Sequence, residues 1–108
     1  MIDHMTFRVA DMVRSKAFYL AALAPLGYRL GFDQRFGDVQ VVGLACADPA
    51  APDGSRIDTW LVDGPSPHGG GVTTGCHLCW SAPDRAEVDV FHAAALAAGG
   101  KDNGAPGL

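Results

Sequence analysis

The sequence predicts an α+β fold built around a strand–helix unit that occurs twice. The stretch from His4 to Gly27 matches the stretch from His77 to Gly100 at a constant offset of 73 residues, without a gap. In each copy an alternation of polar and apolar residues, typical of a strand with one packed face, is followed by an aspartate and a helical pattern. The 108 residues, 48% of them hydrophobic, suffice for one compact domain or for two small repeats that share a core.

The alternation assigns two faces to each repeated strand. The apolar faces are Met5, Phe7 and Val9 in the first copy, and Leu78, Trp80 and Ala82 in the second. His4 and His77 therefore fall on the non-packing faces, at equivalent positions of the two strands. We expect both histidines to face a common cavity.

Both helices are expected to begin after an aspartate. Asp11 and Asp84 are placed as N-caps, because their carboxylates can accept hydrogen bonds from the free amides of the first turn. Glu87, three residues after Asp84, adds the reciprocal partner of a capping box. Pro25 should stop the first helix near Ala24.

Three more strands are expected between the two copies. They span residues 28–36, 39–46 and 56–62, and the first two should form a hairpin around the Gly-Asp turn at residues 37–38. Along the third strand, Asp58, Trp60 and Val62 should share one face. The domain boundaries that follow are residues 1–64 for the first module, 65–75 for a Gly/Pro linker and 76–108 for the start of a second module.

Composition narrows the class of partner. The net charge of −4 and the pI near 5.3 argue against nucleic acid and anionic membranes, so a small-molecule ligand is expected. The sequence has no apolar run of the ~20 residues that a membrane span needs, and no signal-peptide pattern at its start, which favours the cytoplasm. An odd number of cysteines, three, predicts reduced thiols.

The whole chain resembles the vicinal oxygen chelate superfamily, which includes glyoxalase I, extradiol dioxygenases and bleomycin-resistance proteins. The residues that carry the resemblance are the opening segment 2–11, residues 17–19 and 26–28, and His77 followed by Asp84. The resemblance implies two paired βαβββ modules whose curved sheets enclose a cleft. By comparison with the first copy, the second module is truncated after its helix. We expect further chain beyond Leu108, and the alternatives are a partner chain that covers the gap or a minimal fragment. The resemblance also implies a homodimer.

The resemblance implies a metal site as well. His4 matches the ligand on the first strand of the family fold, and His77 matches the ligand that opens the second module. A third ligand falls near Asp58 or Trp60, where the usual glutamate is missing, and the fourth lies beyond Leu108. The ion would be a divalent metal, zinc, iron, manganese, nickel or cobalt, acting as a Lewis acid on two neighbouring substrate oxygens.

Two functions remain open from the sequence. The first is a metal-dependent lyase, isomerase or dioxygenase that acts on a substrate with vicinal oxygens. The alternative is a metal-free binding protein similar to the bleomycin-resistance proteins, in which Trp60, Tyr28 and Phe36 stack on a planar ligand. For Asp58 the alternative is a solvated acid at a strand edge, and for Arg8 either an anion contact or a surface charge. The candidate ligand-binding residues are Thr6, Arg8, Trp60 and Cys79.

Overall fold

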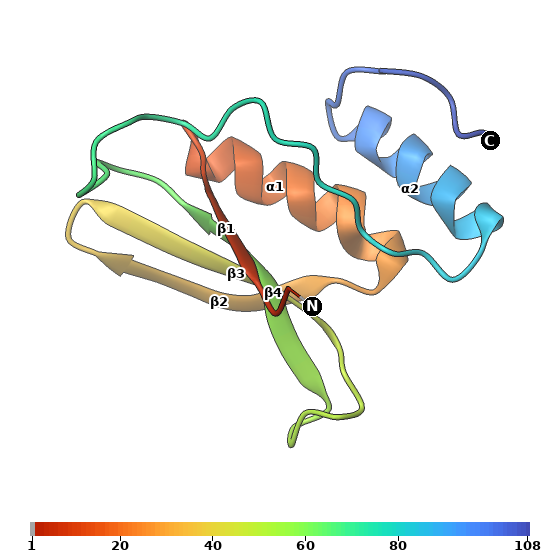
Figure 1. Cartoon of the computed structure of the whole chain (residues 1–108), viewed down its shortest axis with the longest axis horizontal. Coiled ribbons are helices and arrows are strands. Elements are labelled where there is room, and N and C mark those ends of the chain that lie inside the picture. The colour runs from red at the N-terminus through yellow and green to blue at the C-terminus, as the bar shows by residue number, and fades with distance from the viewer. Residues whose placement is uncertain (1) are drawn as a thin grey trace.

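Residues 5–62 form a strand, a helix and three strands, in the order that the sequence predicts. The computed structural model describes residues 2–108 and shows a four-stranded mixed sheet with α-helices on one side (Figure 1). In chain order the elements are β1 (Met5–Arg8), α1 (Met12–Leu23), the 3-10 turn η1 (Ala24–Leu26), β2 (Arg29–Phe36), β3 (Val39–Ala47), β4 (Ser55–Val62) and α2 (Arg85–Ala97). The α+β class is therefore confirmed.

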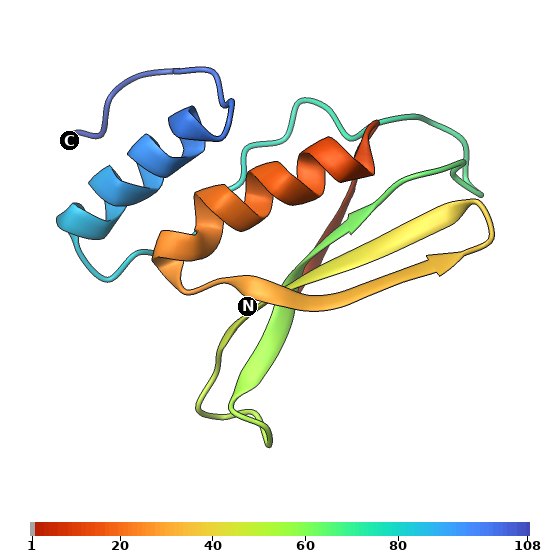
Figure 2. The same ribbon diagram turned by 180° about the vertical axis from the view of Figure 1, so that it is seen from behind.

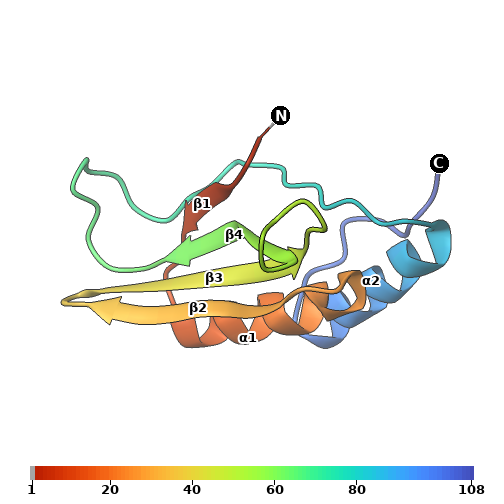
Figure 3. The same ribbon diagram turned by 90° about the horizontal axis from the view of Figure 1, so that it is seen from below.

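The sheet has the strand order β1-β4-β3-β2. β1 and β4 are parallel, whereas β2, β3 and β4 follow one another in antiparallel pairs. The predicted hairpin is present, and Gly37 in its turn has the positive φ of +60° that glycine adopts without strain. One face of the sheet is covered by α1, and no helix or strand formed by residues 2–108 packs on the other (Figure 3).

The core lies between α1 and the sheet. Phe7 of β1 and Val9, which follows this strand, are buried, as the alternation predicted, and Leu23 of α1 has no exposed surface. Val42, Leu44 and Leu61 complete the cluster from β3 and β4. Burying each such side chain contributes about 2 kcal/mol to folding. This packing holds α1 against one face of the sheet.

Both predicted caps are formed. Asp11 Oδ1 accepts from the amide of Arg14 at 3.0 Å, and Asp84 Oδ1 accepts from the amide of Glu87 at 2.9 Å. The reciprocal bond from the Glu87 side chain is missing within residues 2–108, so the capping box is only half formed. α1 ends at Leu23, two residues before the proline that was expected to stop it.

α2 lies beyond the end of the sheet, beside α1. Figure 2 shows it next to α1 and η1, which are the elements it contacts. None of its residues is fully buried. In the described range, 2–108, no helix is long and apolar enough to cross a membrane.

The strand expected at residues 77–82 is not formed. Residues 72–83, which we call the strap, are extended but belong to no sheet. Only Thr73 exchanges hydrogen bonds with β1, where its amide donates to the carbonyl of Arg8 at 3.0 Å and its hydroxyl accepts from the Arg8 amide at 2.9 Å. Residues 74–83 make no backbone–backbone hydrogen bond to any other described residue.

The strap keeps the predicted alternation of half-buried and exposed side chains although it belongs to no β-sheet. Leu78, Trp80 and Ala82 are half-buried, while His77, Cys79 and Ser81 are exposed. Apolar packing therefore orients the strap, but a strand also needs a neighbour to pair its backbone groups, and none is present among residues 2–108. The second copy of the repeat thus forms a helix and an unpaired extended segment, and residues 72–108 do not form a paired βαβββ module.

A β-bulge in the pairing of β3 with β4 changes the face of the sheet on which Asp58 lies. The register between β3 and β4 shifts after Leu44, which pairs with Thr59, so that Ala45 pairs with Ile57 and Asp58 has no partner. A bulged residue breaks the two-residue alternation of a strand. Asp58 consequently contacts groups on the α1 side of the sheet, whereas Trp60 lies on the opposite side, and the prediction that they share a face was wrong.

Candidate functional site

The sheet face opposite α1 carries a row of aromatic side chains. The rings of Phe32 and Trp60 lie 5.5 Å apart at 64°, and Phe32 and Phe36 are stacked with centroids 6.5 Å apart and planes at 13°. Phe36 is 61% exposed. We call this surface the open face, and its apolar members are Phe32, Phe36, Val41, Ile57, Trp60 and Val62.

Gly43 allows the central ring of the open face to lie against the sheet. It pairs with Phe32 on one side and with Trp60 on the other. A Cβ atom at this position would come within 2.8 Å of Ile57 Cγ2 and of Trp60 Cζ3. Real carbon atoms need about 3.5 Å or more, so only glycine leaves the space that the indole occupies.

A hollow of about 310 Å³ adjoins these rings. Trp60 and Thr6, two of the predicted ligand-binding residues, line it together with His4. The rest of its wall is aliphatic, from Val41, Ile57 and Val62. His4 is the single ionisable side chain of this lining, so the hollow suits a largely apolar molecule with one polar contact.

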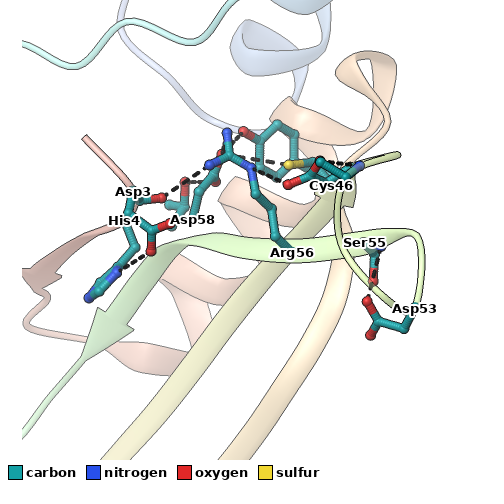
Figure 4. A network of polar contacts seen from close by, with 11 residues as sticks. Asp3, His4, Cys46, Asp53, Ser55, Arg56 and Asp58 are labelled. Carbon is teal, nitrogen blue, oxygen red and sulfur yellow. Dashed lines mark hydrogen bonds and ion pairs between the residues drawn. The ribbon is translucent and has the colours of Figure 1, made fainter. Parts of the chain in front are cut away.

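A second hollow, of about 420 Å³, lies on the α1 side at the end of the sheet. We call it the end cavity, and Figure 4 shows the polar network around it. His4, Asp58 and Cys79, all predicted site residues, line it, and so do Arg56 and Tyr28. The start of the chain, β3, β4 and the strap therefore meet at this point.

Asp58 is the centre of the polar network. Its Oδ2 accepts from Tyr28 Oη at 2.9 Å and from the Cys46 thiol at 3.5 Å, while its Oδ1 accepts from Thr59 Oγ1 at 2.9 Å. Burial, and then the bond to Asp58, raise the pKa of Tyr28 well above its usual value. Burial raises the pKa of the Cys46 thiol as well, so Cys46 is a neutral donor and a poor nucleophile at neutral pH.

Arg56 bridges three acidic segments without a tight ion pair. Its Nε lies 3.5 Å from Asp48 Oδ2, its Nη2 lies 3.7 Å from Asp58 Oδ2, and its Nη1 donates to the carbonyl of Asp3 at 3.3 Å. These distances exceed the 2.7–2.9 Å of strong charge-assisted bonds. Arg56 therefore balances the local negative charge and connects the loop before β4 to the start of the chain.

The three predicted metal ligands are not brought together. His4 lies at both hollows, where its Nδ1 is 2.9 Å from Asp3 Oδ2, and Asp58 lies in the end cavity with its oxygens already hydrogen bonded. His77 is exposed on the strap and does not line either hollow. Across residues 2–108, no three His, Cys, Asp or Glu side chains are grouped so that they could hold an ion. Within residues 2–108, His4 and Asp58 thus supply two of the three or four protein donors that such a metal site uses.

Arg8 and Tyr28, two further residues that were predicted to contact a ligand, make other contacts in the structure. Arg8 Nη1 donates to the carbonyls of Asp63 and Gly64, at 2.8 and 2.7 Å, so its side chain fastens the end of β4. Tyr28 does not join Trp60 and Phe36 on the open face, because its hydroxyl reaches Asp58 on the other side of the sheet.

Sequence reasoning missed Phe32 and Ile57 on the open face and Arg56 in the end cavity. A signal for Phe32 was available, since it is spaced four residues from Phe36 in a segment predicted as a strand. Ile57 had no such signal, because the bulge beside it decides which face it occupies.

The sequence matches no protein-family model and no curated protein. The arrangement of the open face and of the end cavity is therefore the basis on which a function can be proposed.

Proposed function

We propose that the protein binds a small planar molecule on the open face of its sheet, without a metal ion. The observation that carries this proposal is the aromatic row of Phe36, Phe32 and Trp60, which continues into the hollow beside His4 and Thr6. A planar ligand can stack on the exposed rings and place one polar group at the histidine. Each aromatic contact contributes about 0.5–1.5 kcal/mol beyond simple burial.

The openness of this face supports the proposal further. Soluble proteins seldom leave large aromatic side chains uncovered, and such patches often mark binding sites. Phe36, at one end of the aromatic row, is 61% exposed. The hollow of about 310 Å³ is close to the lower limit of pockets that hold small organic molecules.

The resemblance to the vicinal oxygen chelate superfamily belongs to the same proposal. The βαβββ order of residues 5–62 is the order that the resemblance implies for one module, and α2 follows it in the part of the sequence where the second helix was expected. On this basis we further propose a paired second module and a homodimer, with function closest to that of metal-free binding members.

A metal-dependent enzyme is the second candidate. It is favoured by one observation, that His4 and Asp58 line the same cavity although they lie 54 positions apart in the sequence. Elemental analysis of protein purified without a histidine tag distinguishes the candidates. Stoichiometric metal that is lost in the variant His4→Ala would support the enzyme and overturn the metal-free proposal.

The binding proposal is tested by calorimetric titration with uncharged bicyclic aromatic compounds such as quinoline and coumarin. We expect the variant Trp60→Ala to weaken binding at least about tenfold, equal to about 1.4 kcal/mol, because it removes the central ring. Val13→Ala is the control, since Val13 is 81% exposed on α1, across the sheet. Equal affinity in the wild type and in Trp60→Ala, or no binding of any such compound, would contradict the proposal.

A further inference from the structure

A separate cavity of about 240 Å³ lies between the strap, η1 and α2. The strap contributes Leu78, Trp80 and Ala82, the three residues of its inward face, and Leu26 closes the side toward η1. α2 adds Val88 and Phe91, which are three positions apart and so lie on one face of the helix. None of these side chains belongs to the open face, and only Leu26 and Trp80 also line the end cavity.

We propose that this cavity is a second binding site, for a small uncharged apolar molecule with the volume of one aromatic ring or a short alkyl chain. The chemistry of its wall carries the proposal. No charged side chain lines it, and only two of its lining side chains carry a heteroatom, the thiol of Cys79 and the indole of Trp80. An ion or a strongly hydrated group would lose its water there without gaining a partner.

The polar end of Trp80 is already satisfied. Its Nε1 donates to Thr59 Oγ1 at 3.2 Å, and Thr59 is completely buried. The indole is therefore fixed at one edge by the sheet, and the ring offers hydrocarbon surface to the cavity. An apolar guest would contact this ring and that of Phe91 without breaking a hydrogen bond.

The size of the cavity sets the size of the guest. A cavity of about 150 Å³ lined by apolar side chains stays dry and binds benzene, so about 240 Å³ has room for one substituted ring. A single guest of this size would fill the cavity, so the proposed occupant is a small molecule.

The strap provides a way in. Residues 74–83 make no backbone–backbone hydrogen bond with other described residues, so the strap can move outward without breaking a ladder. The cavity also adjoins the end cavity, because Leu26, Cys79 and Trp80 line both. A guest can therefore enter from the end cavity or from beneath the strap.

The test uses iodobenzene, a heavy-atom quencher of tryptophan fluorescence, in the variant Trp60→Phe. The chain has two tryptophans, so Trp80 is then the single emitter and the open face cannot contribute to the signal. We expect saturable quenching. Strictly linear quenching, equal to that of free N-acetyltryptophanamide, would overturn the proposal.

Cavity-filling variants in the same background locate the site. Ala82→Leu places three more carbon atoms in the cavity, and Val88→Phe fills it from the side of α2 should the first variant fail to fold. Each should weaken iodobenzene binding at least about tenfold. Ala93→Leu, the same change as in the first variant but at an exposed position of α2, should leave binding unchanged. Equal binding by a folded filling variant and the parent would place the quencher elsewhere and overturn the proposal.

Discussion

Single residues at the end cavity show how a polar group is kept in a packed environment. Asp58 accepts hydrogen bonds from a phenol, a thiol and a hydroxyl, so protein donors solvate much of its half-buried carboxylate. Leaving such a group without partners would cost about 1–3 kcal/mol. The donors therefore stabilise the bulge that brings Asp58 to this side of the sheet.

The alkaline limit of stability should depend on Tyr28. Its pKa is raised in the folded protein, first by burial, while a tyrosine in the unfolded chain ionises near pH 10. The stabilising contribution is thus fully present below pH 10 and is lost as the pH rises above it, because only the unfolded state releases the proton there. We expect Tyr28→Phe to lose about 1 kcal/mol at pH 7 and to decline less steeply than the wild type above pH 10.

Urea unfolding at several pH values between 7 and 11.5 measures this difference. Tyr19→Phe is the comparison, because burial also raises the pKa of Tyr19 but no hydrogen bond of its hydroxyl accompanies it among residues 2–108. It should reduce the alkaline decline without the loss at pH 7 that the Tyr28 variant shows. Parallel stability curves for the wild type and Tyr28→Phe above pH 10 would refute the role of Tyr28.

At the scale of elements, the sequence was sufficient to predict those features whose causes lie within a few residues of one another. The caps at Asp11 and Asp84 and the turn at residues 37–38 have short-range causes, and the structure confirms them. The bulge at Asp58 has a long-range cause. Ile57 and Trp60 both pack over Gly43, a residue of the neighbouring strand. The hydrophobic pattern along one segment cannot predict a contact with another strand. The candidate site was accordingly predicted in part: Trp60 and Thr6 meet, but Asp58 and Tyr28 lie elsewhere.

The cap of α2 should have a measurable effect because the helix has few other supports. None of its residues is fully buried, and among the helices and strands its main contacts are to α1 and η1. Asp84→Ala removes the acceptor for the Glu87 amide and should cost about 1 kcal/mol, whereas Asp84→Asn retains an acceptor and should cost much less. For a domain of this size, 1 kcal/mol lowers the melting temperature by about 4–8 °C. Equal melting temperatures of the alanine and asparagine variants would show that this bond does not stabilise the helix.

At the scale of the whole molecule, the sequence predicted which side chains of the strap face inward, but not whether the strap forms a strand. Its alternation correctly predicted which side chains face inward, because that depends on hydrophobicity along the segment. Whether the segment becomes a strand depends on a partner with free backbone groups, which lies outside the segment. Only the contact between Thr73 and Arg8 supplies such pairing here.

The bond between Trp80 and Thr59 should therefore anchor the strap to the sheet. The indole N–H reaches a completely buried hydroxyl at 3.2 Å, and this is the one hydrogen bond that joins residues 74–83 to the sheet within the described chain. Trp80→Phe keeps an aromatic ring and removes the donor, and Thr59→Val keeps the shape and removes the acceptor. Because both changes break the same bond, their costs should be non-additive, with a coupling of about 0.5–1.5 kcal/mol in a double-mutant cycle.

Hydrogen exchange and limited proteolysis provide a second test of the hydrogen bond between Trp80 and Thr59. Amides 74–83 should exchange far faster than those of β3 and β4 in the wild type, since they lack backbone partners. In Trp80→Phe, a protease should cut the strap faster, while β3 and β4 keep their protection because their ladders are untouched. Additive mutational costs together with unchanged cleavage would mean that apolar packing of Leu78 and Trp80 holds the strap, and that the hydrogen bond to Thr59 contributes nothing.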